Sequence, residues 1–119
     1  WEWAARGPRG NLYPWGMEPA ASRTNTQSPG KEPEGPLAIL AIIEDATPSG
    51  IIGLAGNVRE WTADRYVGQY IYPPGAADGR TPATLRGSSW KQPDNDVTVR
   101  SKLPSGETFS DDVGLRCVR

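Results

Sequence analysis

The sequence predicts an ordered but irregular fold, rich in loops, with short strands and little helix. Glycine occurs 14 times and proline 12 times in 119 residues, and large aliphatic residues are sparse outside 37–54. Glycine and proline interrupt regular elements, so this composition favours turns and loops over long helices. Five tryptophans argue against disorder, because disordered chains seldom carry so many large apolar rings.

Length and charge exclude several classes of protein. At 119 residues the chain has the size of one small domain or part of one. Its net charge of −1 provides no field that would attract nucleic acid, so we expect no nucleic-acid partner. The longest apolar run, Leu37 to Ile43, is too short to span a bilayer, so no transmembrane segment is expected.

Cysteine and histidine usage restricts the chemistry further. Cys117 is the only cysteine and there is no histidine. An internal disulfide, a Cys/His zinc site and a histidine-dependent triad are therefore excluded within this chain. Cys117 lies in a terminal apolar stretch, which predicts a small buried side chain rather than a reactive thiol.

The first third of the chain predicts a helix end followed by a long loop. The segment 1–7 is rich in alanine, pairs Glu2 with Arg6 at i,i+4, and ends at Gly7, where a left-handed C-cap fits. The composition of residues 8–36 is typical of a loop, which an aromatic anchor at 13–16 interrupts.

The rest of the chain predicts short strands separated by turns. Strands are expected where apolar or β-prone residues cluster, and turns where glycine, proline, asparagine and aspartate cluster. The expected strands are 37–43, 58–61, 84–86, 97–99 and 113–118; the expected turns include 48–50 and 56–57, with 94–96 and 111–112 as surface turns.

Five short motifs, taken in their order along the chain, resemble the motifs of one protein family. They are WEWAARG at 1–7, YPWG at 13–16, LAGNVREW at 54–61, LRGSSW at 85–90 and VGLRC at 113–117. Together they are similar to the motifs of formylglycine-generating-enzyme-like domains, also called sulfatase-modifying factors. The resemblance implies an α+β, C-type-lectin-like fold. It covers about the C-terminal half of such a domain, so we expect 1–119 to form a single partial domain.

The resemblance also implies which residues hold the fold together. It predicts the tryptophans to be internal anchors that pack in the core, and the arginines to tie loop carbonyls or carboxylates together. The expected structural residues are Trp1, Trp3, Trp15, Trp61, Trp90, Arg86, Arg100 and Arg116.

The oxidase chemistry that the resemblance implies needs two cysteines that hold copper(I). Soft thiolates are what copper(I) requires. The two positions, which follow the LRGSSW phrase, are Gln92 and Val97 here. No copper is therefore expected, and catalytic residues are not predicted.

Calcium is the cofactor that the resemblance leaves open. It implies oxygen ligands at Gly56, Val58 and Glu60, but the fourth position is Gly53, which offers no side-chain oxygen. A second site would use Asn25 and Thr26. Its acidic ligand is left open between Glu32 and Glu34, and the alternative is that these are solvated loop residues.

These observations predict a non-catalytic, lectin-like binding or assembly module, an accessory subunit with a protein partner. Long loops would display the contacts, with Tyr66, Tyr70 and Tyr72 as the expected binding surface. The alternative is part of a metalloenzyme whose catalytic ligands lie outside this chain, or one that uses carboxylates such as Glu60 and Asp64. Otherwise these two carboxylates would pair with Arg86 or Arg100. The resemblance favours an extracytoplasmic location, in the bacterial periplasm or secreted.

Overall fold

The computed structural model describes residues 1–19, 21–27, 30, 34–67, 70–72, 82–93, 102–104 and 110–117. The regular elements within these ranges are the α-helix α1 (Glu2–Arg6), the 3-10 turns η1 (Ala21–Arg23) and η2 (Ile39–Ile42), and the strands β1 (Arg59–Val67), β2 (Tyr70–Tyr72), β3 (Ala83–Arg86), β4 (Lys102–Pro104) and β5 (Val113–Gly114). Most of them are short, as predicted, but β1 has nine residues and extends well beyond the predicted strand 58–61. The expectation of a loop-rich α+β chain with little helix is confirmed.

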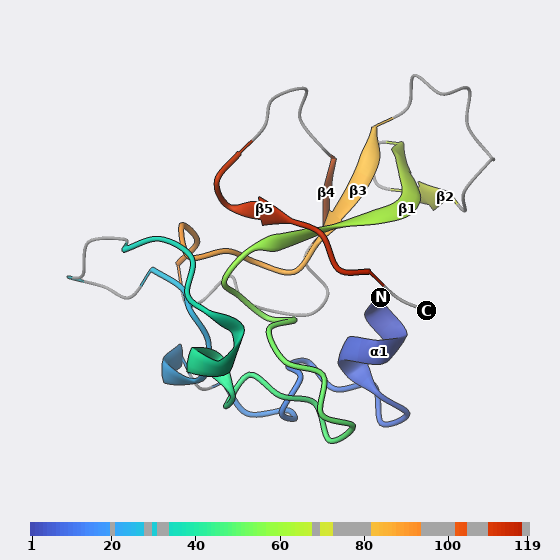
Figure 1. Cartoon of the computed structure of the whole chain (residues 1–119). Coiled ribbons are helices and arrows are strands. Elements are labelled where there is room, and N and C mark those ends of the chain that lie inside the picture. The colour runs from blue at the N-terminus through green and yellow to red at the C-terminus, as the bar shows by residue number, and fades with distance from the viewer. Residues whose placement is uncertain are drawn as a thin grey trace.

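One mixed sheet organises the chain, in the order β2-β1-β3-β4, with β5 added beside β1. Neighbouring strands are antiparallel except β1 and β5, which are parallel, so the expectation of antiparallel strands alone was incomplete. Figure 1 shows this sheet on one side of α1 and the long loops. The predicted strand 113–118 is only two residues long, and the expected strand 97–99 lies outside the described residues.

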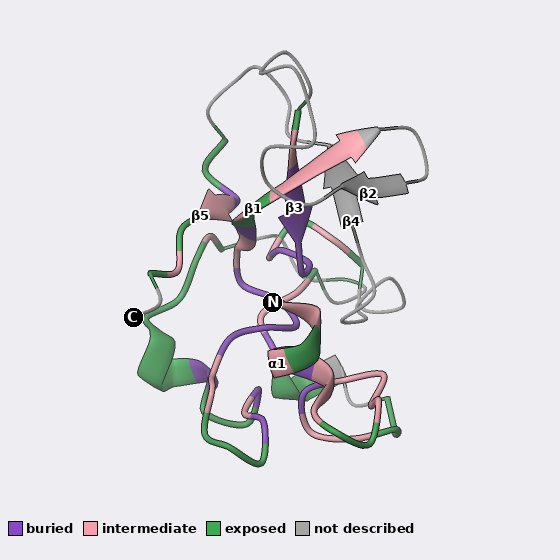
Figure 2. Ribbon diagram, turned by 90° about the vertical axis from the view of Figure 1, so that its right-hand side faces the viewer, coloured by how far each residue is buried: buried purple, intermediate pink, exposed green. Residues whose placement is uncertain are grey.

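The prediction of a buried strand at 37–43 was wrong. Residues 39–42 form the 3-10 turn η2, closed by the Ala41 N–H to the Ala38 carbonyl at 2.8 Å. Ile42 is buried, whereas Leu40 is 75% exposed and its apolar neighbours are exposed as well, as the green turn in Figure 2 shows. A run without polar alternation does not distinguish a strand from a turn that buries one residue.

Helix α1 follows its sequence signals. Arg6 Nη1 lies 3.0 Å from Glu2 Oε1, which confirms the i,i+4 pair. The Gly7 N–H donates to the Trp3 carbonyl at 2.9 Å and Gly7 has φ of 60°. Its ψ of −176° is not left-handed helical, so glycine ends the helix with a positive φ but without the expected cap conformation.

The tryptophans divide between anchors and surface residues. Trp1 packs against the small core of Ala5 and Leu54, as expected. Trp3 is 78% exposed and Trp61 is 40% exposed, so their assignment to the core was wrong. Trp61 follows Glu60, which is buried on β1, and successive side chains of a strand point to opposite faces.

Buried polar residues outnumber buried apolar ones in the described part of the chain. The interior between the sheet and the loops is therefore held by hydrogen bonds and ion pairs as well as by apolar packing. Among the described residues, no helix has the length and apolar character needed to cross a membrane.

Candidate functional site

Glu60 is the centre of an ion-paired cluster at the start of β1. Arg116 Nη2 lies 2.6 Å from Glu60 Oε1, and Arg116 Nε donates to both carboxylate oxygens. The indole Nε1 of Trp1 donates to Oε2 at 2.6 Å, and Arg116 also donates to the Ile52 carbonyl at 2.8 Å. The cluster joins the N-terminus, β1 and the end of the chain.

A second cluster fixes α1 to the sheet. Glu2 pairs with Arg6 through Oε1 and with Arg86 of β3 through Oε2, each at 3.0 Å. Arg86 and Arg116 each bind a carboxylate from a distant part of the chain, Glu2 and Glu60 respectively. Glu60 pairs with Arg116 and Arg86 pairs with Glu2, so the expected pairing of Glu60 with Arg86 was wrong. Arg100 lies outside the described residues.

Asn57 connects three loops, which sequence reasoning recognised only as a turn. It is buried, with φ of 71°, a region that asparagine tolerates better than most residues. Its side chain donates to the Leu37 carbonyl at 3.1 Å and accepts from the Leu37 N–H at 2.8 Å, as a β-strand backbone would. Its own N–H donates to the Asn25 carbonyl, and its carbonyl accepts from Trp90.

Asp45 is a buried carboxylate that the sequence did not single out. Its side chain accepts from the hydroxyl of Thr24 at 2.5 Å and from the N–H groups of Ala55 and Gly56. Burial raises the pKa of Asp45 to about 6, and these hydrogen bonds oppose the increase. An aspartate after an apolar run carries no sequence signal that separates it from a surface residue.

Asp112 corrects the expectation that 111–112 is only a surface turn. Asp112 is buried and accepts from Arg59 Nη1 and Ser89 Oγ, each at 2.8 Å, and from Ser110. Burial raises its pKa, but the hydrogen bonds from Ser110 and Ser89 and the charge of Arg59 bring the pKa of Asp112 below its ordinary value. Asp111 is exposed as expected and pairs with Lys91. The segment 94–96 lies outside the described residues.

The turn at 87–92 is held by hydrogen bonds, and it has Gln92 where the resemblance implies a copper ligand. Gly87 has φ of 80°, and a Cβ there would lie 3.0 Å from the Leu54 carbonyl. The main chain of Gln92 donates to the Ser89 carbonyl and accepts from the Gln27 N–H. Trp90 is half-buried, its Nε1 has no partner among the described residues, and the Lys91 ammonium lies 4.8 Å from its ring.

Copper(I) does not fit these residues. A glutamine amide cannot supply the soft thiolate that copper(I) requires, and Val97, which lies outside the described residues, is apolar. Cys117 is exposed at the end of the described chain, so the expectation that it is buried was wrong. Strand β5 ends at Gly114, and no strand pairing among the described residues includes Cys117.

The residues considered for calcium fall into two groups. Glu60 already faces the guanidinium of Arg116, which supplies a positive charge there, and a Cβ at Gly56 would lie 2.6 Å from the Asn25 carbonyl. The first group, Gly56, Val58 and Glu60, does not fit a calcium shell, because its only carboxylate is already paired with Arg116. The second group consists of the consecutive residues Asn25 and Thr26. The side chain of Asn25 donates to the Gly35 carbonyl at 3.0 Å.

The tyrosines expected to form the binding surface belong to the neighbouring antiparallel strands β1 and β2. Tyr66 of β1 is half-buried and pairs with Ile71, while Tyr70 pairs with Val67 and Tyr72 with Arg65. In the other aromatic region, Trp15 stacks on Tyr13 with ring centroids 5.2 Å apart, and its Nε1 donates to the Glu18 carbonyl at 2.9 Å. Trp15 is half-buried and packs within its own loop, outside the core cluster of Ala5 and Leu54.

Comparisons with known proteins agree with this framework. The chain matches the model of the sulfatase-modifying factor enzyme 1-like domain over residues 1–119. It is 35% identical to "Inactive C-alpha-formylglycine-generating enzyme 2" of Mus musculus and 34% identical to the protein of that name from Bos taurus. Each match covers 98% of this chain but 40% of the relative.

The chain thus spans about two fifths of the length of these relatives. The motifs that carry the match include the ion-paired residues Glu60, Arg86 and Arg116, which hold the fold together. The chain belongs to the formylglycine-generating-enzyme-like family, as a sulfatase-modifying factor enzyme 1-like domain.

Proposed function

We propose that this chain is a non-catalytic, lectin-like binding or assembly module, an accessory subunit of a larger complex. The observation that carries the proposal is the turn at 87–92, whose main chain is hydrogen-bonded at Gln92 while that residue offers no thiolate. The relatives bear the word "inactive" in their names, which supports the same conclusion for this chain.

An oxidation assay tests the non-catalytic part. The protein is incubated with a CxPxR peptide, copper and oxygen, and aldehyde is measured by mass spectrometry. We expect no aldehyde, because neither Gln92 nor Val97 supplies a thiolate. A variant with Gln92→Cys and Val97→Cys is the reference for restored copper ligands. Aldehyde formed by the unchanged protein would refute the proposal.

The exposed apolar segment 37–43 supports the assembly part. Leu37, Ile39, Leu40 and Ile43 are large apolar side chains exposed within seven residues of one another. A contiguous apolar surface of this kind is typical of an interface. Because the relatives extend well beyond the part that this chain matches, we propose that this segment contacts the remaining portion of a formylglycine-generating-enzyme-like domain, on the same or another polypeptide.

Coexpression tests this contact. The protein is produced with the portion of the mouse relative that the chain does not match, and the complex is measured by size-exclusion chromatography with light scattering. We expect a one-to-one complex that Leu40→Lys with Ile43→Lys prevents. Glu44→Lys, an exposed change beside the segment, is the matched control and should leave the complex intact. A complex indifferent to the double substitution would contradict the assignment.

The second candidate is a metalloenzyme whose catalytic ligands lie outside this chain. The 40% coverage of the relatives favours testing it, since residues beyond the match could supply ligands. The same oxidation assay on the complex decides between the two functions. Oxidation by the complex but not by this chain alone would favour the enzyme.

Two further properties remain proposals. Calcium bound at Asn25 and Thr26 would help to order the loop, and a thermal melt with and without chelator tests this. An unchanged midpoint would exclude a structural ion. We also infer an extracytoplasmic location, which localisation of the tagged protein in its own cells tests.

A further inference from the structure

We propose that a pocket beside α1 binds a small organic anion with an aromatic or otherwise flat apolar body. Four stretches of sequence form it: the end of α1, the turn at 8–11, the aromatic loop at 15–17 and the turn at 47–49. Its volume is about 590 Å³, within the usual range of ligand pockets. None of its residues belongs to the turn at 87–92.

The pocket wall combines apolar surface with positive charge. The apolar residues of the lining include Ala4, Pro8, Trp15, Met17 and Pro48. Two arginines line the pocket, and no carboxylate of the described residues does. The pocket therefore favours an apolar body that carries a negative group.

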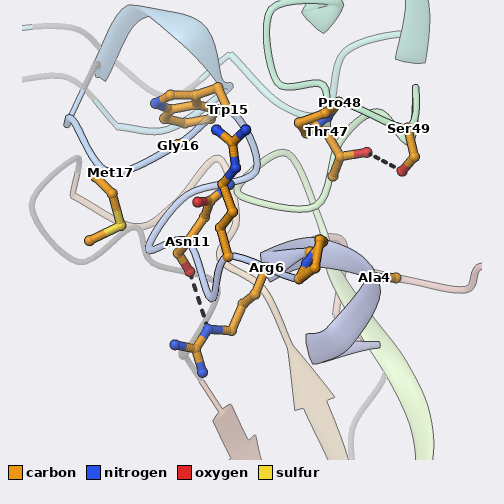
Figure 3. A pocket seen from close by; sticks show the side chains of 12 residues that line it. Ala4, Arg6, Asn11, Trp15, Gly16, Met17, Thr47, Pro48 and Ser49 are labelled. Carbon is orange, nitrogen blue, oxygen red and sulfur yellow. Dashed lines mark hydrogen bonds between the residues drawn. The ribbon is translucent and has the colours of Figure 1, made fainter.

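The two arginines differ in availability. Arg6 is occupied, since it pairs with Glu2 at 3.0 Å and donates to the carbonyls of Asn11 and Gly10. Figure 3 shows the Arg6 bond to Asn11 within the lining. Arg9 is exposed and forms no ion pair with any residue that the structure describes. Arg9 is thus the cation that can bind a ligand carboxylate, while Arg6 holds the wall in place.

Trp15 provides a fixed flat surface. Its ring stacks on Tyr13 with an interplanar angle of 12°, and its Nε1–H is used by the Glu18 carbonyl. The Arg23 guanidinium also lies over this ring, 6.0 Å from its centroid. A ring held in this way needs little ordering when a flat ligand packs against the part of it that lines the pocket. Across the pocket in Figure 3, the hydroxyls of Thr47 and Ser49 are 2.9 Å apart and provide polar groups.

A pair of nearly isosteric probes separates charge from shape. Naphthalene-1-acetate and its neutral amide, 1-naphthaleneacetamide, are titrated into the protein by isothermal calorimetry. We expect saturable binding of the acid, with affinity about tenfold higher than that of the amide, as one charge-assisted hydrogen bond at the pocket rim provides. Added salt should reduce this difference, because the charged contact is exposed.

Substitutions locate the binding. Arg9→Gln should reduce the affinity for the acid to that for the amide and leave the amide unchanged. Lys91→Gln removes the same charge from a residue that does not line the pocket, so it should change neither affinity. Ser49→Trp, at an exposed position of the lining, should fill the pocket and weaken both probes.

Folding is checked by the melting temperature of each variant. Arg9→Gln should leave it unchanged because Arg9 is exposed, and Ser49→Trp should lower it only slightly, by the loss of the hydroxyl contact with Thr47. Equal affinity for acid and amide, or an Arg9→Gln variant that binds the acid as well as the unchanged protein, would overturn the charge assignment. No saturable binding of the acid to the unchanged protein would overturn the proposal as a whole.

Discussion

Arg116 binds the carboxylate of Glu60 through two guanidinium nitrogens, with Nη2 at 2.6 Å and Nε at 2.9 Å from Oε1. Glu60 is buried, so removal of one partner leaves an uncompensated charge or a lost set of hydrogen bonds. We expect Arg116→Met to lower the free energy of unfolding by about 3 kcal/mol, measured by urea denaturation.

The double variant tests whether this loss belongs to the pair. Glu60→Met with Arg116→Met removes both charges, so its loss should be smaller than the sum of the two single losses. Additive losses would show that the two residues act independently and that the paired geometry has little energetic weight.

The raised pKa of Asp45 predicts that a decrease in pH stabilises the fold over a defined pH range. Burial raises its folded pKa from 3.8 to about 6, so the folded state binds a proton more tightly than the unfolded state does. This contribution is fully present below pH 3.8 and is lost as the pH rises through about 6. We expect the free energy of unfolding to be higher at about pH 4 than at about pH 7, by about 2 kcal/mol.

Asp45→Asn is the control for this pH dependence. The substitution removes the titrating group. The increase in the free energy of unfolding from about pH 7 to about pH 4 should therefore largely disappear, whatever the absolute stability of the variant. Asp112 has the opposite sign, because its pKa is lowered and its contribution is lost only as the pH falls below 3.8. A pH profile that is the same in the variant and the unchanged protein would exclude Asp45 as its source.

Gly56 and Gly114 give a matched test of close packing. Neither has a positive φ, so alanine introduces no backbone strain at either position. A Cβ at Gly56 would lie 2.6 Å from both the Asn25 carbonyl oxygen and the Thr24 hydroxyl, whereas one at Gly114 would meet the side chain of Val58 at 2.9 Å. We expect Gly56→Ala to lower the unfolding free energy by about 2 kcal/mol and Gly114→Ala by less, since Val58 can shift. Equal losses would contradict the backbone clash at Gly56.

The sequence predicted elements whose signals are local. The Glu2 and Arg6 pair, the turn at 56–57 and the strand at 84–86 depend on spacing or turn residues within a few positions. The family motifs supplied Arg86 and Arg116 as structural residues. Their carboxylate partners, Glu2 and Glu60, lie far away in the chain, so spacing alone could not pair them correctly.

Burial was harder to predict than element type. Hydrophobicity alone placed Leu40 in the core, although only Ile42 of that turn is buried, and it gave no indication that Asp45 and Asp112 are interior. These aspartates are buried because backbone N–H groups, hydroxyls or an arginine satisfy them, and those donors converge only in the fold. The pocket around Arg9 likewise forms from four separate segments, and no single motif predicts it.

Trp1 and Trp3 are expected to differ sharply in their contribution to stability. The indole N–H of Trp1 donates to the buried carboxylate of Glu60 at 2.6 Å, whereas Trp3 is 78% exposed. Phenylalanine keeps an aromatic ring but removes the N–H donor. We expect Trp1→Phe to lower the unfolding free energy by about 2 kcal/mol, as loss of a hydrogen bond to a charged group does, and Trp3→Phe by less than about 0.5 kcal/mol. Thermal and urea denaturation of both variants measure the difference. Similar losses at the two positions would show that the indole N–H of Trp1 adds little and that Glu60 depends on Arg116 alone.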